Sequence, residues 1–413
     1  MTDLYYKQLS KALTDAGICT PTLIVDKERF NKNIDLLTNT LSSGFDYRIV
    51  AKSLPSIPML QHIMRRAGTV RLMSFHLPFL MELIQQVPAA DILLGKPMPL
   101  AAAKYFYAWY QQQASLCFAP ELQLQWLIDS PERAEQYEQL AKELNTTIRI
   151  SLEVDIGLHR GGFKPDSTFV QLLKKVHESP HLSLGGLMGY DAHISKIPAF
   201  LGGLPVAFQS TRSRYKLFTD LIRSTLGDDV LKDLCLNTGG SSTYSLYDDE
   251  HDDIVANEIA TASALVKPTD FDVPTLEKHL PAAFIAAPVL KRIEHPEIPE
   301  APKLSALLRL LGLLPKAGCY IYGGNWLATP SYPKSAKISS IFGRSSNQEF
   351  YELPASSDLK VDDFMFFRPT QSEAIFLQFG HIAVYDNGKI SDWWSVFDHP
   401  EGFPMLTNSD TIN

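Results

Sequence analysis

The sequence predicts an α/β protein in which a closed (β/α)8 barrel of the TIM type is followed by a smaller, mostly β domain. Three observations predict this fold class. Up to about residue 260, short apolar, β-branched runs alternate with longer segments whose apolar residues recur every three to four positions. Eight such strand-plus-helix units occur in succession, and after about residue 270 the segments become Pro-rich, aromatic and β-branched. A doubly wound open sheet is the alternative arrangement of the same units.

The eight predicted strands are separated by segments with the periodicity of amphipathic helices. One helix has a well-defined start, because Ser130 suits the N-cap, Pro131 the first helical position and Glu132 the first turn. Strands that alternate with helices form a parallel sheet, and eight of them suffice to close it into a barrel. The predicted strands cover residues 47–51, 70–74, 91–95, 125–129, 148–155, 184–191, 233–239 and 253–258.

Two domains are predicted within the 413 residues. The barrel is assigned to residues 21–270, and the β-rich domain to residues 271–413 together with residues 1–20. In the second domain, the segment YDNGKI is typical of a β-hairpin, with Asn387 and Gly388 at its turn.

Composition limits the classes of function. The formal net charge is −8 and no long basic run occurs, which argues against nucleic acid as a partner. No stretch reaches the ~18 uninterrupted apolar residues of a membrane span. The four cysteines are scattered and form no CxxC pair, as expected of reduced thiols. We therefore expect a cytoplasmic enzyme that acts on a small molecule.

Lys52 directly follows the apolar run that ends in Val50 and Ala51. Active sites of (β/α)8 barrels lie at the carboxyl ends of the strands, which is where Lys52 is predicted to lie. Partial burial and neighbouring positive charge favour the neutral amine that forms a Schiff base with a carbonyl compound, so Lys52 is a candidate nucleophile. The alternative is a lysine that simply extends its ammonium group into solvent.

The segment LNTGGSSTY, residues 236–244, is a candidate phosphate site. Gly239 and Gly240 allow the backbone to expose successive N–H groups, and the three hydroxyl residues that follow add donors. In a closed barrel the eighth strand pairs with the first, so a loop after strand seven lies two strands from Lys52. A Schiff-base lysine near a phosphate site indicates pyridoxal phosphate (PLP) as the cofactor. An ordinary Gly-rich loop is the alternative interpretation.

Several segments resemble, in order and spacing, the fold-type III PLP enzymes of the alanine racemase superfamily, and within it the D-threonine aldolase and D-serine dehydratase branch. The resemblance covers about residues 20–270, and a later stretch, DDFMFFRPTQSEAIFLQFGHIAVYDNGKISDWW, is similar to that branch's β domain more loosely. The segments are PTLIVD at 21–26, IVAK ending at Lys52, EVDIGLHRGGF at 153–163, GLMGYDAH at 186–193 and NTGGSSTY at 237–244.

The resemblance implies a role for individual residues. Lys52 would form the Schiff base with PLP and act as a base on one face of the substrate. Arg160 would lie near the cofactor, and Tyr190 and His193 would pack against its pyridine ring, although a histidine with satisfied core hydrogen bonds is the alternative for His193. Taken alone, the segment that carries Arg160 would be interpreted as a structural loop. The remaining implied cofactor contacts are Thr238, Gly239, Gly240 and Ser241 around the phosphate, and Glu258 as a carboxylate paired with the pyridine nitrogen.

The sequence departs from the family pattern at its usual metal site. D-serine dehydratases and D-threonine aldolases carry a His-x-Cys or His-x-Asp pair after a proline, whereas the corresponding stretch here, RPTQSEA, has Gln371 and Glu373. Glutamine is a poor ligand for a zinc-like ion compared with imidazole, so we expect no metal. Glu373 is instead predicted to be a catalytic acid or base, or to contact the substrate, with a plain structural carboxylate as the alternative.

The predicted function is that of a homodimeric PLP-dependent lyase that cleaves or dehydrates a D-amino acid or β-hydroxy amino acid. A PLP-dependent racemase is the first alternative, and it would need a second base on the opposite face, such as Tyr320 or Tyr322. Two further alternatives are a non-catalytic PLP-binding protein and a cofactor-free aldolase that uses Lys52 on a phosphorylated sugar. The sequence does not select the substrate.

Overall fold

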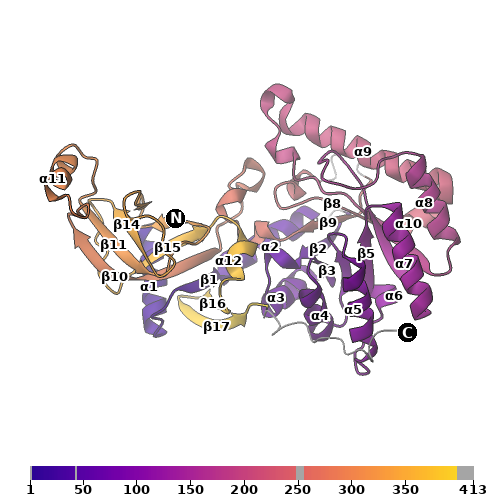
Figure 1. The fold of residues 1–413 in the computed structure, drawn as a ribbon, viewed down its shortest axis with the longest axis horizontal. Helices are drawn as coiled ribbons and strands as arrows, with labels where there is room; N and C mark the ends of the chain where they lie inside the picture. The colour runs from indigo at the N-terminus through magenta and orange to yellow at the C-terminus, as the bar shows by residue number, and fades with distance from the viewer. Residues whose placement is uncertain (1, 42–43, 248–254, 398–413) are drawn as a thin grey trace. The chain divides into compact units, whose positions relative to one another are not determined.

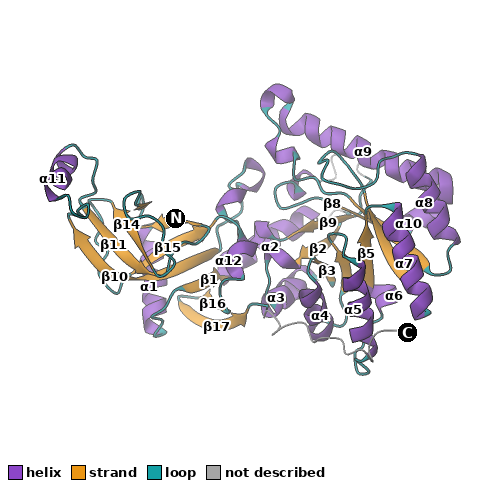
Figure 2. Cartoon of the chain, viewed as in Figure 1, coloured by secondary structure: helices purple, strands orange, loops and turns teal. Residues whose placement is uncertain are grey.

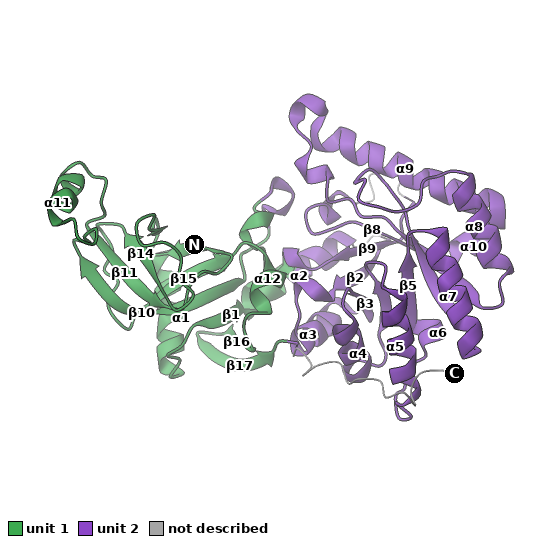
Figure 3. Ribbon diagram, in the orientation of Figure 1, with its two compact units in different colours: residues 1–33, 265–272, 279–396 green, residues 34–264, 273–278, 397–413 purple. Residues whose placement is uncertain are grey.

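The computed structural model describes residues 2–41, 44–247 and 255–397. The chain divides into two compact units (Figure 3). The barrel unit contains residues 34–264, 273–278 and Phe397, and the sheet unit contains residues 1–33, 265–272 and 279–396. In this division the boundary between the two units falls within a helix, at residue 34.

The barrel unit contains a closed, eight-stranded parallel barrel, as the sequence predicts (Figure 1). Neighbours in sequence are neighbours in the sheet, and closure comes from pairing of the first barrel strand with the last, in the register Asp46↔Glu258 to Ile49↔Thr261. The strands are β2 (Asp46–Val50), β3 (Arg71–Ser74), β4 (Asp91–Leu94), β5 (Leu124–Ile128), β6 (Ile148–Glu153), β7 (Leu182–Met188), β8 (Cys235–Thr238) and β9 (Glu258–Thr261).

The last barrel strand differs most from its predicted position of 253–258, of which residues 253 and 254 lie outside the described ranges. The strand begins at Glu258. Asn257 precedes it, and its side chain bonds to the backbone beside β8, with Oδ1 2.8 Å from Leu236 N and Nδ2 2.9 Å from Leu234 O. The Asn257 backbone bonds on both sides as well, since its N–H donates to Leu236 O at 3.1 Å and its carbonyl oxygen accepts the Asp46 N–H at 2.9 Å. Glu258 follows as the first residue of β9, at the amino-terminal end of the barrel.

Helices surround the barrel, and Figure 2 shows them alternating with the strands. The predicted helix start at Ser130 is confirmed, because its Oγ accepts a hydrogen bond from Arg133 N at 3.3 Å. No helix in the described ranges combines the length and apolarity needed to span a membrane. The helices of the barrel unit are α3 (Ile57–Ala67), α4 (Leu77–Gln86), α5 (Leu100–Gln111), α6 (Pro120–Gln123), α7 (Pro131–Leu144), α8 (Ser167–Glu178), α9 (Gly203–Leu226) and α10 (Asp228–Lys232), while α2 (Lys27–Leu41) leads into it.

The sheet unit is built on a mixed sheet with the order β13-β14-β11-β10-β1-β16-β17, while β15 pairs with β10 and β12. The predicted hairpin is present, since Asn387 and Gly388 connect its two strands with positive φ angles of 51° and 80°. The elements are α1 (Asp3–Asp15), β1 (Thr22–Asp26), β10 (Ala283–Glu294), α11 (Pro302–Leu310), β11 (Ala317–Tyr322), β12 (Ala328–Tyr332), β13 (Lys337–Ile338), β14 (Gln348–Leu353), β15 (Phe364–Pro369), α12 (Ser372–Phe376), β16 (His381–Asp386) and β17 (Lys389–Ser395).

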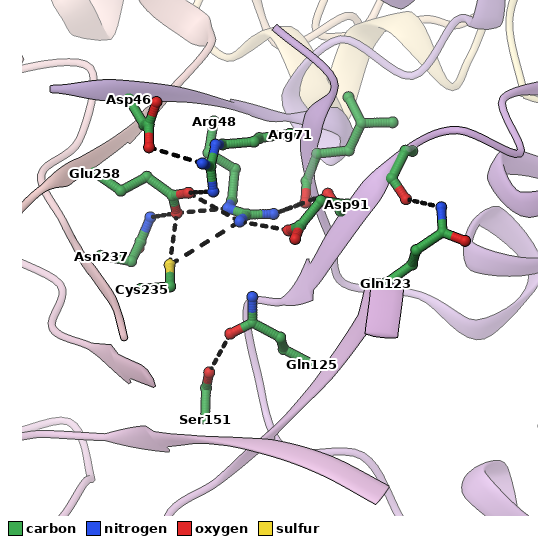
Figure 4. A network of polar contacts seen from close by, with 12 residues as sticks. Asp46, Arg48, Arg71, Asp91, Gln123, Gln125, Ser151, Cys235, Asn237 and Glu258 are labelled. Atoms are coloured by element: carbon green, nitrogen blue, oxygen red, sulfur yellow. Dashed lines mark hydrogen bonds and ion pairs between the residues drawn. The ribbon is translucent and has the colours of Figure 1, made fainter. Parts of the chain in front are cut away.

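A buried charge network occupies the amino-terminal end of the barrel (Figure 4). Arg48 is fully buried, and its guanidinium donates to both carboxylate oxygens of Glu258 and to Asp91 Oδ1. Asn237 and Cys235 donate to the same Glu258 carboxylate, at 2.7 and 3.1 Å. Burial alone would raise the pKa of Glu258, but the Arg48 charge and the hydrogen bonds from Arg48, Cys235 and Asn237 together outweigh burial, and the pKa is lowered. The network joins β2, β4, β8 and β9 by interactions that are costly to break singly.

We expect Arg48→Met to destabilise the protein, because it leaves the Glu258 carboxylate buried without its guanidinium partner. The expected loss in free energy of unfolding is about 3–5 kcal/mol, measured by urea denaturation. Lys104→Met is a matched control, since it removes an exposed ion pair with Glu143 and should cost less than about 1 kcal/mol. Equal losses in the two variants would contradict a structural role for the network.

The Arg48–Glu258 ion pair makes the stability of the protein depend on pH. Because the folded-state pKa of Glu258 is lowered, its contribution is fully present above the unfolded-state pKa of about 4.3 and is lost as pH falls through the folded-state value. The stability gap between the wild type and Arg48→Met should therefore narrow when denaturation is measured from pH 7 towards pH 3. A gap of constant size over that range would argue against the ion pair as its source.

Candidate functional site

The candidate site lies at the carboxyl-terminal mouth of the barrel, where Lys52 and the Gly-rich loop come from neighbouring parts of one closed sheet. β9 pairs with β2 on one side and with β8 on the other. Lys52 follows β2, and Gly239 follows β8, so the two predicted features lie two strands apart at the same end of the barrel. This arrangement confirms the order that the sequence predicts for the strands carrying them.

Lys52 lies in a single 3-10 turn, Ala51–Ser53, that begins as soon as β2 ends. Ala51 and Ser53, on either side of Lys52 in this turn, are buried, while Lys52 itself is half-buried. Its Nζ lies 4.5 Å from the ring centroid of Phe75, which follows β3, so the ammonium group makes a cation–π contact. The amine is thus directed along an aromatic wall at the mouth of the barrel.

The loop after β8 is arranged to bind an anion. Gly239 has φ +84°, a left-handed conformation that glycine adopts without strain. Gly239 and Gly240 are buried, and within the described part of the chain the backbone amides of residues 239–242 donate no hydrogen bond. Buried N–H groups of this kind need an acceptor, and successive ones form a nest that suits phosphate oxygens.

Ser241 connects this loop to the loop after the last strand. Its Oγ lies 2.8 Å from Thr261 Oγ1 and accepts the Ala264 backbone N–H at 3.1 Å. The loops after the seventh and eighth strands are the usual phosphate site of such barrels. The hydroxyl of Ser241 therefore holds two loops together, and the free amides beside it remain available to a ligand.

Tyr190 and Arg160 meet beside this loop. The Arg160 guanidinium lies 5.1 Å from the Tyr190 ring centroid and 3.6 Å from Glu153 Oε1. Burial raises the pKa of Glu153, and Arg160 opposes that effect. A Cβ atom on Gly240 would come within 3.2 Å of the Tyr190 ring, so glycine permits the close approach of loop and ring. Arg160, Tyr190 and Gly240 are thus brought together.

His193 lies near the same mouth, in the segment that follows β7. Its Nε2 lies 3.3 Å from Thr211 Oγ1 on α9, and a Cβ atom on Gly157 would come within 2.9 Å of the same nitrogen. The Nδ1 atom is buried and has no hydrogen-bond partner among the described residues. Burial lowers the pKa of His193, which favours the neutral imidazole.

Two predicted site residues, Glu258 and Glu373, lie outside this cluster, and Thr238 lies directly before the Gly-rich loop. Glu258 starts β9 opposite Asp46, at the other end of the barrel from Lys52, and its carboxylate is already bound by Arg48, so it is not available to a ligand at the mouth. Thr238 is buried at the end of β8, with its hydroxyl 3.3 Å from that of Tyr247. Glu373 belongs to the sheet unit, half-buried in the first turn of α12, and its catalytic role stays a prediction.

The structure also reveals polar residues at the mouth that the sequence interpretation did not select. Asp191 is fully buried and accepts hydrogen bonds from Thr243 and Tyr247. Asp155 accepts two backbone N–H groups and lies 2.7 Å from the Nδ1 atom of His159. Both carboxylates fall inside segments that the resemblance quotes, GLMGYDAH and EVDIGLHRGGF, so the signal was a charged residue at the carboxyl end of a predicted strand.

Comparisons with known proteins agree with this geometry. The family model described as the alanine racemase N-terminal domain matches residues 25–256. No curated protein sequence matches the chain.

Solved structures match over nearly the whole chain. D-threonine aldolase from Filomicrobium marinum superposes with a TM-score of 0.68 at 16% identity, covering 92% of this chain and 95% of that one. D-threo-3-hydroxyaspartate dehydratase from Delftia sp. HT23 gives 0.67 at 14%, covering 91% and 97%. An alanine racemase from Clostridium difficile 630 in complex with cycloserine gives 0.65 at 13%, covering 91% and 98%.

At such identities these likenesses concern the fold. The family match spans the barrel from β2 to β8, including Lys52 and the Gly-rich loop, and ends before β9 begins. Together with the lysine after β2 and the Gly-rich loop after β8, it assigns the chain: this protein belongs to the alanine racemase N-terminal domain family.

Proposed function

We propose that the protein is a PLP-dependent amino acid lyase that acts on a D-amino acid or β-hydroxy amino acid. One observation carries the proposal: a half-buried lysine and a loop whose backbone amides donate no hydrogen bond to the described residues lie two strands apart at the mouth of one barrel. An amine for the aldehyde and an anion nest for the phosphate are the two fixed attachment points that PLP requires. Membership in the alanine racemase family supports the same cofactor.

The residues present suit this cofactor. The amides of residues 239–242 would bind the phosphate, and Tyr190 and His193 would flank the ring. The unpartnered, buried Nδ1 of His193 is a polar atom for which a ligand can supply the partner. The residue that pairs with the pyridine nitrogen is not Glu258, because Arg48 holds that carboxylate at the far end of the barrel.

Lys52 is proposed to have two tasks. Its Nζ would hold the cofactor until the amino group of the substrate displaces it, and the released amine would then accept or return a proton at the substrate Cα. PLP, when bound, supplies the electron sink that stabilises negative charge at Cα. The cation–π contact with Phe75 directs the lysine along one wall of the mouth, so Lys52 is proposed to serve one face of the substrate.

A lyase needs a group that acts on the β-hydroxyl. Removal of the hydroxyl proton would break the Cα–Cβ bond and give an aldehyde and glycine, whereas loss of the Cα proton and then of the hydroxyl as water would lead to a keto acid and ammonia. We propose that Glu373 is the group that acts on the β-hydroxyl: it would remove the hydroxyl proton in the first reaction, or give a proton to the departing hydroxyl in the second. Gln371 Nε2 donates to Asp270 Oδ2 at 3.0 Å, so the amide beside Glu373 is engaged with a carboxylate.

Racemisation is the second candidate, because an alanine racemase matches 91% of the chain. It requires a further base on the face opposite Lys52, and Tyr320 or Tyr322 of the sheet unit is the candidate for that group. We propose in either case that two chains associate as a homodimer, which is the assembly that the resemblance implies.

The first experiment tests the cofactor. Purified protein mixed with PLP is expected to show the visible absorbance band of a lysine-bound cofactor, and borohydride should abolish it and leave a reduced adduct on the peptide that contains Lys52. Lys52→Ala should show neither the band nor the adduct, whereas Lys104→Ala, an exposed lysine paired with Glu143, should show both. A wild type without the band, or a Lys52→Ala variant identical to it, would reject the proposal.

The second experiment identifies the reaction. The PLP-loaded protein is incubated separately with D-threonine, D-serine and D-alanine, and products are separated on a chiral column. We expect an aldehyde or a keto acid from a β-hydroxy amino acid, with a rate that a chelator leaves unchanged, because glutamine is a poor zinc ligand and the two oxygen groups of Gln371 and Glu373 would hold such an ion only weakly. Formation of an L-enantiomer without either product would establish the racemase instead.

A further inference from the structure

A buried carboxylate bridges two loops at the mouth of the barrel. Asp191 follows β7 and is 0% exposed. Its Oδ1 accepts a hydrogen bond from Thr243 Oγ1 at 2.7 Å, and its Oδ2 accepts one from the Tyr247 hydroxyl, also at 2.7 Å. Both donors lie in the segment after β8. Asp191 therefore connects the loop after the sixth barrel strand with the loop after the seventh.

The bridge adjoins the anion loop at Gly240. The carbonyl oxygen of Gly240 accepts the backbone N–H groups of Thr243 at 3.1 Å and Tyr244 at 2.9 Å, and Thr243 Oγ1 lies 3.3 Å from the same oxygen. A Cβ atom on Gly240 would lie 3.6 Å from Asp191 Oδ1. The Asp191 carboxylate thus lies next to Gly240, in the loop whose backbone amides donate no hydrogen bond to the described residues.

The bridge also reaches the strand that carries the loop. The Tyr247 hydroxyl lies 3.3 Å from Thr238 Oγ1, at the last position of β8. Asp191, through Thr243 and Tyr247, therefore contacts the segment on both sides of residues 239–242. The position of the free amides is determined by these contacts at each end of the four-residue stretch.

The burial of the Asp191 carboxylate is unfavourable in free energy unless its hydrogen bonds offset the cost. Its side-chain partners among the described residues are the hydroxyl groups of Thr243 and Tyr247 rather than cations, and burial raises its pKa to about 6. A buried carboxylate without a cation costs free energy that an apolar side chain of similar size would not. The two fixed acceptors that it offers to Thr243 and Tyr247 are what an apolar side chain could not provide.

We propose that Asp191 is a positioning residue that holds residues 239–242 in the conformation that binds the phosphate of the cofactor. This inference rests on the proposed function and adds a residue to it. Asp191 acts through Thr243 and Tyr247, and its effect should be confined to ligands that carry a phosphate.

Comparison of PLP with pyridoxal, which lacks the phosphate, tests the inference. Thr243→Val should weaken equilibrium PLP affinity about tenfold, the effect of losing one buried hydrogen bond to a charged group, and Asp191→Ala, which removes two such bonds, should weaken it at least as much. Pyridoxal affinity should change by less than about twofold. Inorganic phosphate should compete with PLP in the wild type and compete less well in both variants.

Two further variants serve as controls. Asp191→Asn keeps an oxygen acceptor for Thr243 and an amide that can pair with the Tyr247 hydroxyl, so it should retain most of the PLP affinity. Ser151→Ala removes another fully buried hydroxyl, bonded to Gln125 at 2.6 Å and remote from the loop in sequence and hydrogen bonding, and should leave both affinities unchanged.

The outcomes are distinguishable. Equal loss of PLP and pyridoxal affinity in Thr243→Val, or no loss of either, would overturn the positioning role while leaving the cofactor assignment intact. A wild type that binds neither compound would reject the proposed function and this inference with it. If Asp191→Ala does not fold, Thr243→Val decides the question, because it retains the shape of the side chain and removes only the hydroxyl donor.

Discussion

The pairing of β2 with β9 is the constraint on which the rest of the barrel unit depends. Without it, the first and last strands would be the two edges of an open sheet, and Lys52 would be separated from the Gly-rich loop by the width of that sheet. With it, residues almost two hundred positions apart in the chain lie two strands apart. The buried Arg48–Glu258 pair joins the same two strands, so the closing seam has both a hydrogen-bonded ladder and an ion pair.

The mouth of the barrel is organised by hydroxyl and carboxylate side chains that connect adjacent loops. Ser241 joins the loops after β8 and β9, and Asp191 joins those after β7 and β8. Because backbone amides cannot be placed by packing alone, such connections determine where the free N–H groups of the loop point. Arg160 and Tyr190 contact each other beside the same loop.

Most of the fold could be predicted from the sequence, because alternating strand and helix patterns are local and the barrel follows from their number. The position of β9 could not, since Asn257 ahead of it bonds beside β8 through its side chain as well as its backbone, and no periodicity reports such contacts. That shift also explains the position of Glu258, which the resemblance assigned to the cofactor and which the structure places in the Arg48 network.

Predicting the site was less complete for a similar reason. Lys52 and Gly239 could be selected because each follows a strand and has a recognisable chemistry. Asp191 follows a strand as well, but its importance depends on Thr243 and Tyr247, more than fifty residues later, and on the absence of a nearby cation among the described residues. Partnerships of this range are properties of the closed barrel rather than of any segment.

The separation of the charge network from the mouth has a practical consequence for protein engineering. Arg48 and Glu258 lie at one end of the strands, and every loop that lines the mouth begins at the other end. Substitutions that alter substrate choice in those loops leave the ion pairs of the opposite end intact. The barrel therefore offers a tolerant scaffold for laboratory evolution of selectivity, with libraries confined to loop positions and the Arg48 cluster held constant.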